Sequence, residues 1–193
     1  MGILIFNELF LVIFTPLWYP DSMIRQTPAR PFVPLLQAIT DGDAGKLKIL
    51  LDLNEQRLDT IEGLALLLIA IGTGNSFSVK HLLGAGVNPD INNTHGLSPL
   101  IMAIRSENSY MVKYLVEAGA DPNRLDGGGR LPLVEAIGIE NSYAISYLMA
   151  AGADRNMPDG QGCRPWSKAA VLDDDHYIKL LHYQEKTINT FVL

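Results

Sequence analysis

The stretch GLSPLIMAIRSENSYMVKYLVEAGADPN, residues 96–123, holds the pattern that decides the fold of this chain. A shift of 33 residues aligns it with the sequence before and after it. Glycines recur in one phase of this period, at Gly63, Gly96, Gly129 and Gly162. Self-similarity at a period of about 20 to 50 residues is typical of repeat proteins, in which each unit is one small supersecondary structure. The sequence therefore predicts an array of stacked units.

The residues around these glycines predict a turn followed by a helix. Asn93, Asp126 and Asp159 each stand three residues before a glycine, with Thr60 in the same column, and an Asp or Asn side chain followed by Gly favours a chain reversal. A proline then suits the first turn of a helix, where Ser98 is expected to supply an N-cap oxygen. The prolines, and the small alanines that follow them, are Pro99, Pro132, Pro165, Ala70, Ala103, Ala136 and Ala169.

A second helix is predicted in each unit after a short break. Val112, Leu115 and Val116 show the i, i+3, i+4 spacing of a buried stripe, which recurs in the other units. Gly119 is expected to end its helix with a positive φ. The capping column contains Asp43, Asn75, Asn108, Asn141 and Asp174, and the terminating column contains Asn54, Gly86, Gly119 and Gly152.

These motifs, above all Gly96-Leu-Ser-Pro-Leu100 and Ala118-Gly-Ala-Asp-Pro-Asn123, closely resemble the ankyrin repeat. The resemblance covers residues 32–185 and implies an all-α ankyrin-repeat solenoid of about five helix-turn-helix units with projecting β-turn or hairpin loops. The Thr-Pro-Leu-His segment of the family survives only in part, as in Ser98-Pro99-Leu100-Ile101. The expected units are residues 32–59, 60–92, 93–125, 126–158 and 159–185, with a C-terminal tail at 186–193. His182 stands where earlier units have apolar residues, so the last unit is expected to be a cap.

The composition fits one globular domain. The chain has 193 residues, of which 48% are hydrophobic, and a net charge of −6 that argues against binding to nucleic acid. Its single cysteine, Cys163, cannot form an internal disulfide, so a reducing cytoplasm is the expected location.

The N-terminal 31 residues are expected to be an apolar extension followed by a Pro-rich linker. Ile3 to Tyr19 is almost wholly apolar, which leaves a membrane anchor or an export signal as the alternative. Asn7, Glu8 and Pro16 interrupt it, and the segment has no basic region before it, so this alternative is the less favoured.

No motif points to catalysis, and we expect no catalytic residue, cofactor or metal ion. The run Gly127–Gly129 is interpreted as a repeat turn and not as a phosphate loop, because no basic residue completes one. Asp173, Asp174, Asp175 and His176 could form a metal site, but acids at a helix start are favoured by capping. The four histidines occupy different positions of their repeats, which does not suggest a shared site.

The resemblance implies that function lies in residues that do not repeat, at the loop tips and on the face of the first helices. An apolar stripe of Ile61, Leu64, Leu97, Ile139 and Leu172 would anchor a protein partner, with Arg105 and Arg130 beside it. The alternative is that these side chains pack against the next turn. The predicted residues at the loop tips are Ile61, Glu62, Leu64, Thr94, His95, Leu97, Arg130 and Gln161, and those on the face of the first helices are Arg105, Ser106, Ile139 and Leu172.

The leading hypothesis is therefore a monomeric protein–protein interaction module that acts as a scaffold or adaptor. A second hypothesis is a membrane-tethered adaptor anchored by residues 1–19, and a third is an enzyme whose site has no recognisable motif.

Overall fold

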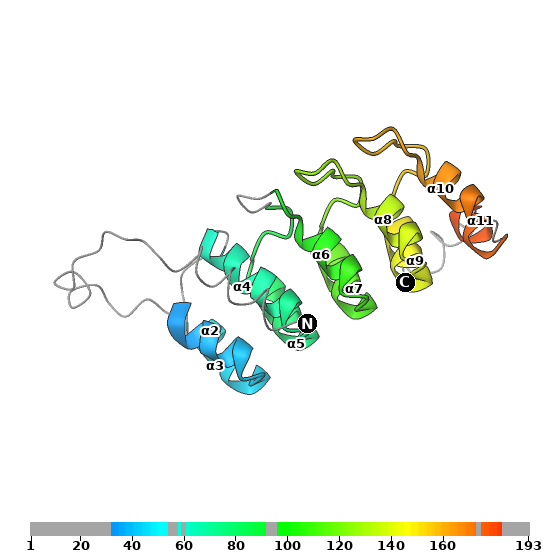
Figure 1. The fold of residues 1–193 in the computed structure, drawn as a ribbon. Coiled ribbons are helices and arrows are strands. Elements are labelled where there is room, and N and C mark those ends of the chain that lie inside the picture. The colour runs from blue at the N-terminus through cyan, green and yellow to red at the C-terminus, as the bar shows by residue number, and fades with distance from the viewer. Residues whose placement is uncertain (1–31, 54–57, 59–60, 92–95, 173–174, 183–193) are drawn as a thin grey trace, which may run out of the picture. The chain divides into compact units, whose positions relative to one another are not determined.

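The computed structural model describes residues 32–53, 58, 61–91, 96–172 and 175–182, all within Phe32–Leu193, the second of the two units into which the chain divides. These residues contain ten helices (Figure 1). In chain order they are α2 Phe32–Thr40, α3 Ala44–Asp52, α4 Ile61–Gly72, α5 Ser76–Gly84, α6 Pro99–Arg105, α7 Ser109–Glu117, α8 Pro132–Gly138, α9 Ser142–Ala150, α10 Pro165–Val171 and α11 Asp175–His182.

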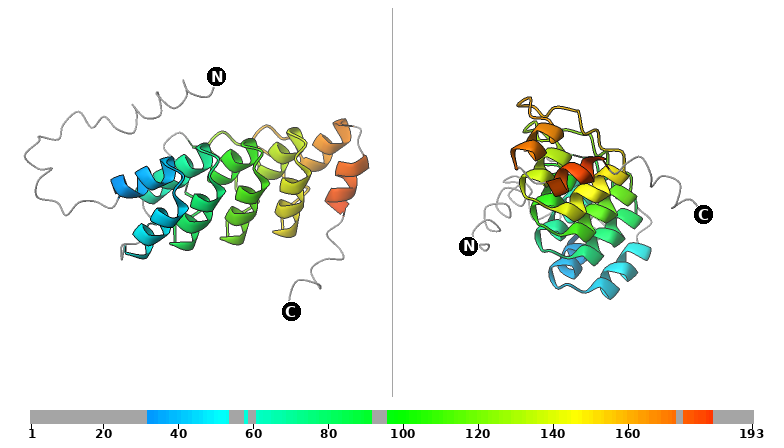
Figure 2. Two further views of the ribbon diagram at one scale, coloured as in Figure 1. Left: turned by 90° about the horizontal axis from the view of Figure 1, so that it is seen from below. Right: turned by 90° about the vertical axis from the view of Figure 1, so that its right-hand side faces the viewer.

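The helices form two layers. The first helices of the pairs, α2, α4, α6, α8 and α10, each contact the next in the series, and the second helices, α3, α5, α7, α9 and α11, do the same. Each first helix also packs against the second helix that follows it, and Figure 2 shows the pairs succeeding one another along the array. This arrangement confirms the predicted all-α ankyrin fold.

The first helices begin where the sequence predicts. Pro99, Pro132 and Pro165 are the first residues of α6, α8 and α10, where the missing N–H leaves no helical bond unmade. Ser98 occupies the N-cap position of α6, but its side chain makes no capping hydrogen bond, so that part of the prediction is wrong. The side chain of Ser98 is buried, and the helix start relies on the proline.

The second helices are capped largely as predicted. The Oδ1 atoms of Asp43, Asn75 and Asn141 accept hydrogen bonds from backbone N–H groups three residues further on, at 2.8–3.1 Å. Asn108 stands at the N-cap of α7 without such a bond. Asp174 and Asn54 lie outside the described residues.

The helix ends also follow the sequence prediction. Gly86, Gly119 and Gly152 have φ values of 89°, 92° and 89°. After α7, the N–H groups of Gly119 and Ala120 donate to the carbonyls of Val116 and Leu115, which closes the last turn. A side chain would be strained at this φ, so glycine is the residue that allows the chain to leave the helix in this direction.

One hydrophobic core runs between the layers. It combines the small alanines of the first helices, such as Ala103 and Ala136, with the stripe of each second helix, such as Val112 and Leu115, and all four side chains are fully buried. The predicted stripes and the close-packing alanines are thus confirmed. The side chain of His182 lies outside the described residues, so the expected polar cap is untested.

Within the described residues, no helix combines the length and apolar character that crossing a membrane requires. The apolar stretch at residues 3–19 lies outside those residues, so the predicted extension and its membrane alternative are not tested.

Candidate partner-binding surface

The loops before α8 and α10 are built on the same kind of turn, in which an aspartate side chain accepts two backbone N–H groups. Oδ1 of Asp126 accepts the N–H groups of Gly128 and Arg130 at 2.9 Å each, and the N–H of Gly129 donates to the Asp126 carbonyl at 2.9 Å. Asp159 repeats these bonds in the next loop, to Gln161, Gly162 and Cys163. The predicted Asp-Gly reversals are therefore present in both loops.

Arg130 strengthens the first of these turns. Its Nε lies 2.7 Å from Oδ2 of Asp126, whose side chain is completely buried. Burial raises the pKa of Asp126, but the hydrogen bonds from the side chain and backbone of Arg130 and from the backbone of Gly128 lower it by more, so the net pKa is below its usual value. The guanidinium of Arg130 is consequently held by its own loop and is only partly available to a partner.

Neighbouring loops are joined backbone to backbone. The N–H of Gly127 donates to the carbonyl of Gly96, and that of Gly160 donates to the carbonyl of Gly129, both at 2.7 Å. The glycine run at 127–129 therefore serves as a repeat turn, as predicted. These bonds hold neighbouring loops in fixed positions relative to each other on the projecting side of the array (Figure 1).

Polar side chains add a second set of links at the base of the loops. Asn123 donates through Nδ2 to the carbonyl of Gly152 at 3.0 Å and accepts from the N–H of Asp154 at 2.7 Å. One unit earlier, the carboxylate of Asp90 accepts the N–H of Asp121 at 3.0 Å. Such bonds between units hold successive helix pairs in register.

The first helices present a mixed surface, which we call the first-helix face and define as Met102, Arg105, Glu135, Lys168 and Val171. Arg105 of α6 donates through Nε to Oε1 of Glu135 on α8. A Cβ built on Gly138 would lie 3.4 Å from Cε of Lys168, so the lysine stem passes close to that glycine. Met102 is half-buried against the core, while Val171 is 82% exposed. One ion pair, a lysine and accessible apolar atoms thus share this face.

The structure corrects the prediction for the second unit. Ile61, Glu62 and Leu64 were expected at a loop tip, but all three lie in the first turn of α4. Leu64 is only 3% exposed and cannot contact a partner, whereas Ile61 is 79% exposed. The column that holds a turn in later units is therefore helical here.

Most of the expected apolar stripe is buried or only partly exposed. Ile139 and Leu172 are half-buried and pack against the core, and Leu97 is half-buried. Ile139 and Leu172 therefore contribute to the packing of the stack, which fits the alternative interpretation. Only Ile61 of the five stripe residues is fully exposed.

The polar members of the predicted set have mixed outcomes. Arg105 and Gln161 are exposed. The hydroxyl of Ser106 donates to the carbonyl of Ala103 at 2.8 Å, so part of its role is to close α6. Thr94 and His95 lie outside the described residues.

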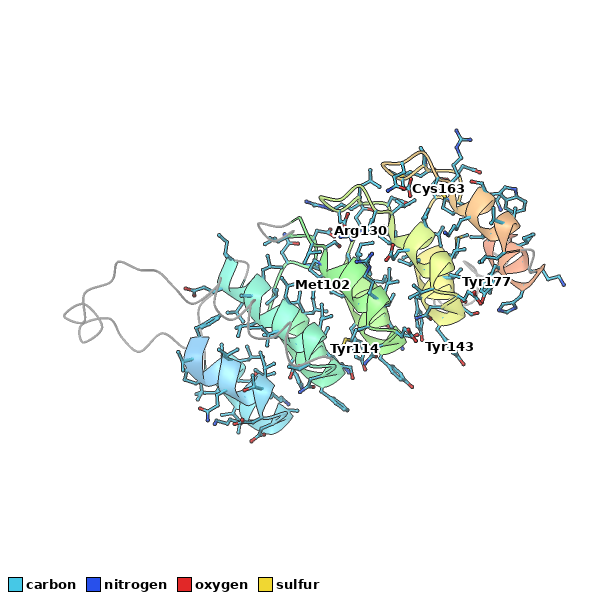
Figure 3. The ribbon with its side chains drawn as sticks, viewed as in Figure 1. Met102, Tyr114, Arg130, Tyr143, Cys163 and Tyr177 are labelled. Carbon is cyan, nitrogen blue, oxygen red and sulfur yellow. The ribbon has the colours of Figure 1, made fainter. Side chains whose placement is uncertain are left out.

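The binding residues predicted from the sequence do not include Met102, Glu135 and Lys168. They occupy one column of the 33-residue period, together with Ile69, and each is partly exposed on its first helix. Comparing this column across units, and not only the residues at the loop tips, would have found them. Figure 3 labels Met102 on α6, and Arg130 and Cys163 in the loops.

Within the described ranges, no group of three or more His, Cys, Asp and Glu side chains could hold a metal ion. Asp173 and Asp174, part of the weighed metal alternative, lie outside those ranges. Cys163 is half-buried in its loop, with Sγ 3.9 Å from the carbonyl of Arg164.

Comparison with known proteins agrees with this architecture. The family model of ankyrin repeats in three copies matches residues 35–126, and this part of the chain consists of ankyrin repeats. Members of the family are generally protein–protein interaction modules and typically have no enzymatic activity. No curated protein matches the chain.

Proposed function

We propose that the chain is a scaffold or adaptor that binds a protein partner across the first-helix face and the neighbouring loops. The observation that most directly supports this proposal is the mixed chemistry of that face, where Met102 and Val171 expose apolar atoms beside the Arg105–Glu135 pair and Lys168. Interfaces of this kind combine a few apolar anchors with a polar rim. The exposed members of the predicted set, Ile61 and Gln161, extend the surface at two further positions.

The rigidity of the loops supports the same proposal. Because Gly96–Gly127 and Gly129–Gly160 are joined through their backbones, the loops lose little conformational entropy when a partner binds.

We further propose that the array has five units with the bounds predicted from the sequence. We also propose that the protein acts as a monomer in the cytoplasm.

The test is a double substitution, Arg105→Glu with Val171→Asp, in the full chain. It places repulsive charge at the centre and edge of the first-helix face, while exposed ion pairs contribute only about 0–1 kcal/mol to folding. Proteins crosslinked to the wild type in cells and identified by mass spectrometry should be lost or reduced about tenfold.

The matched control is Lys48→Glu with Ile49→Asp on α3, which makes the same two chemical changes on exposed residues of the second-helix layer. Equal recovery of partners by the first-helix variant and the wild type would refute the placement. Equal loss in both variants would show that the effect is general charge and not this face.

The membrane-tethered alternative rests on the apolar composition of residues 3–19. Cell fractionation separates the two hypotheses: a tethered protein sediments with membranes, and a chain starting at Met23 does not. If both forms remain in the soluble fraction, the tether is excluded.

A further inference from the structure

Three exposed aromatic side chains form a row on the second helices. Phe77, Tyr110 and Tyr143 are the second residues of α5, α7 and α9, each 33 residues from the next, and they are 64%, 65% and 71% exposed. Because α5 contacts α7 and α7 contacts α9, the three rings occupy the same place on adjacent helices. The row lies where the second helices begin, at the ends remote from the projecting loops, as Tyr143 shows in Figure 3.

These three rings are not part of the hydrophobic core of the stack. Two residues further along, Val79, Val112 and Ile145 fill the core and are completely buried. Aromatic side chains carry a large apolar surface that is normally buried, so a repeated exposed position is unusual for a face that only meets water. Exposure of an aromatic ring at the same position in three successive units suggests that a binding partner covers the row.

The charges around the row select the kind of partner. Glu107 and Glu140 lie three residues before Tyr110 and Tyr143, both are exposed, and neither forms an ion pair with any side chain in the described part of the chain. The carboxylates and the two rings together form what we call the acidic aromatic edge.

The lysines on the same helices are already engaged. Lys113 pairs with Glu117 at 3.7 Å, and Nζ of Lys80 lies 5.5 Å from the ring centroid of Tyr114. The charge that remains for a partner at this edge is therefore negative. The net charge of −6 on the chain favours encounter with a basic group in the same way.

Hydrogen bonds keep the edge in place. The hydroxyl of Ser109 donates to Oδ1 of Asn141 at 3.2 Å, which joins the starts of α7 and α9. The hydroxyl of Tyr177 donates to the carbonyl of Glu140 at 3.2 Å, and Ser142 Oγ lies 3.1 Å from Nε2 of His176. Glu140 and Tyr143 are thus presented on a backbone that is tied on both sides.

We propose that the acidic aromatic edge, Glu107, Tyr110, Glu140 and Tyr143, binds an arginine-rich segment of a protein. A guanidinium group forms charge-assisted hydrogen bonds with a carboxylate and stacks on an aromatic ring, so one arginine side chain satisfies both features. Lysine has the charge but lacks the planar group, and it binds this edge more weakly. The surface is separate from the first-helix face, so the array has two places at which to hold proteins.

The experiment measures binding of a fluorescein-labelled peptide with three Arg-Gly-Leu repeats to the full chain by fluorescence anisotropy. Two variants test the edge: Tyr110→Ser with Tyr143→Ser, and Glu107→Gln with Glu140→Gln. We expect each to weaken binding about tenfold, because each removes two contacts of modest strength. Probes with Lys or Glu in place of Arg should bind more weakly and not at all, respectively.

The matched control is Asp41→Asn with Asp52→Asn, which removes two exposed carboxylates from the first helix pair. Its affinity should stay within about twofold of the wild type. An equal loss of affinity in this control would show that the probe binds by non-specific charge attraction. Unchanged affinity of the tyrosine variant would show that the rings do not contact the probe. Either result overturns the proposal.

A third variant of the edge separates binding from folding. Glu107 and Glu140 have φ values of 55° and 60°, so Glu107→Gly with Glu140→Gly removes both carboxylates and relieves backbone strain at the same time. We expect a higher melting temperature together with about tenfold weaker binding of the arginine probe. A more stable variant that keeps its affinity would contradict the role of the carboxylates.

Discussion

The start of α4 and the loop before α8 occupy the same phase of the 33-residue period, but they are built differently. Gly129 lies in a projecting loop with φ of 73°, and a Cβ there would lie 3.1 Å from Cα of Gly160. Gly63 is the third residue of α4, where a Cβ would lie 1.8 Å from the carbonyl oxygen of Leu58. One column thus contains glycine for two reasons, a left-handed backbone in the loop and close packing in the helix.

The turns between the two helices of a pair show the opposite relationship. Gly42, Gly74, Glu107 and Glu140 each stand directly before the N-cap residue of a second helix, and all four have φ between 55° and 75°. Here the backbone is constant and the residue type differs. Residue identity and backbone conformation therefore vary independently along the array, and substitutions can separate them.

The largest effect is expected at Gly63. Gly63→Ala should lower the free energy of unfolding by about 3 kcal/mol, because the methyl group would overlap the Leu58 carbonyl and the backbone would have to move. Urea denaturation followed by circular dichroism measures this change. Gly72→Ala in the same helix is the control, since a Cβ there meets nothing within 4 Å, and it should be neutral or slightly stabilising. Equal effects would rule out close packing as the reason for Gly63.

A smaller loss is expected where loops meet. Gly96→Ala combines a φ of 74° with a Cβ 2.6 Å from Cα of Gly127, and should cost about 2 kcal/mol. Gly162→Ala has a similar φ of 81° but open space around the new Cβ, and should cost about 1 kcal/mol. The difference between the losses in unfolding free energy of the two variants measures the effect of the close contact between the loops. If the two costs are equal, that contact does not stabilise the array.

The two aspartate turns differ in the burial of the acid and in its partner: Asp126 is buried and bonded to the Arg130 side chain, whereas Asp159 is half-buried. Asp126→Asn should lower the free energy of unfolding at pH 7 by about 1–2 kcal/mol, because a neutral amide replaces the carboxylate that accepts the hydrogen bonds of Arg130. Asp159→Asn should cost less, since Cys163 stands where the other loop has Arg130. Thermal denaturation of both variants measures the difference.

The effect of Asp126 should depend on pH. Its pKa in the folded chain is lowered, so its carboxylate stabilises the fold above the unfolded value of about 3.9, and this stabilisation is lost as the pH falls through the folded-state pKa. The gap between the wild type and Asp126→Asn should close toward acid pH. A gap that widens on acidification would contradict the sign of the shift.

The smallest expected effect is a gain in stability. Glu140→Gly should raise the free energy of unfolding by about 1 kcal/mol, because glycine adopts a φ of 60° without strain. Glu140→Gln removes the charge and keeps the strained backbone, so it should change stability little. A scanning calorimeter resolves the two, and equal melting temperatures would show that the turn is not strained.

Much of the fold could be predicted from the sequence because its signals are local. A proline at a helix start, an Asn at an N-cap and a glycine after a helix each act within a few residues, and Pro132, Asn141 and Gly152 behave as expected. The predicted partner surface was less successful because exposure depends on neighbouring units. Leu64, Ile139 and Leu172 look available in the sequence, but adjacent helices cover them wholly or in part.

The sequence by itself determined the repeat, most of the helix boundaries and the residues of the core, since a period of 33 and an i, i+3, i+4 stripe specify one way to stack. Only the tertiary structure decided which of the remaining side chains meet solvent. It placed Arg105 against Glu135 from the next unit and left the rings of Tyr110 and Tyr143 uncovered. These outcomes depend on contacts between units about one repeat apart in the chain, whose distances no local pattern encodes.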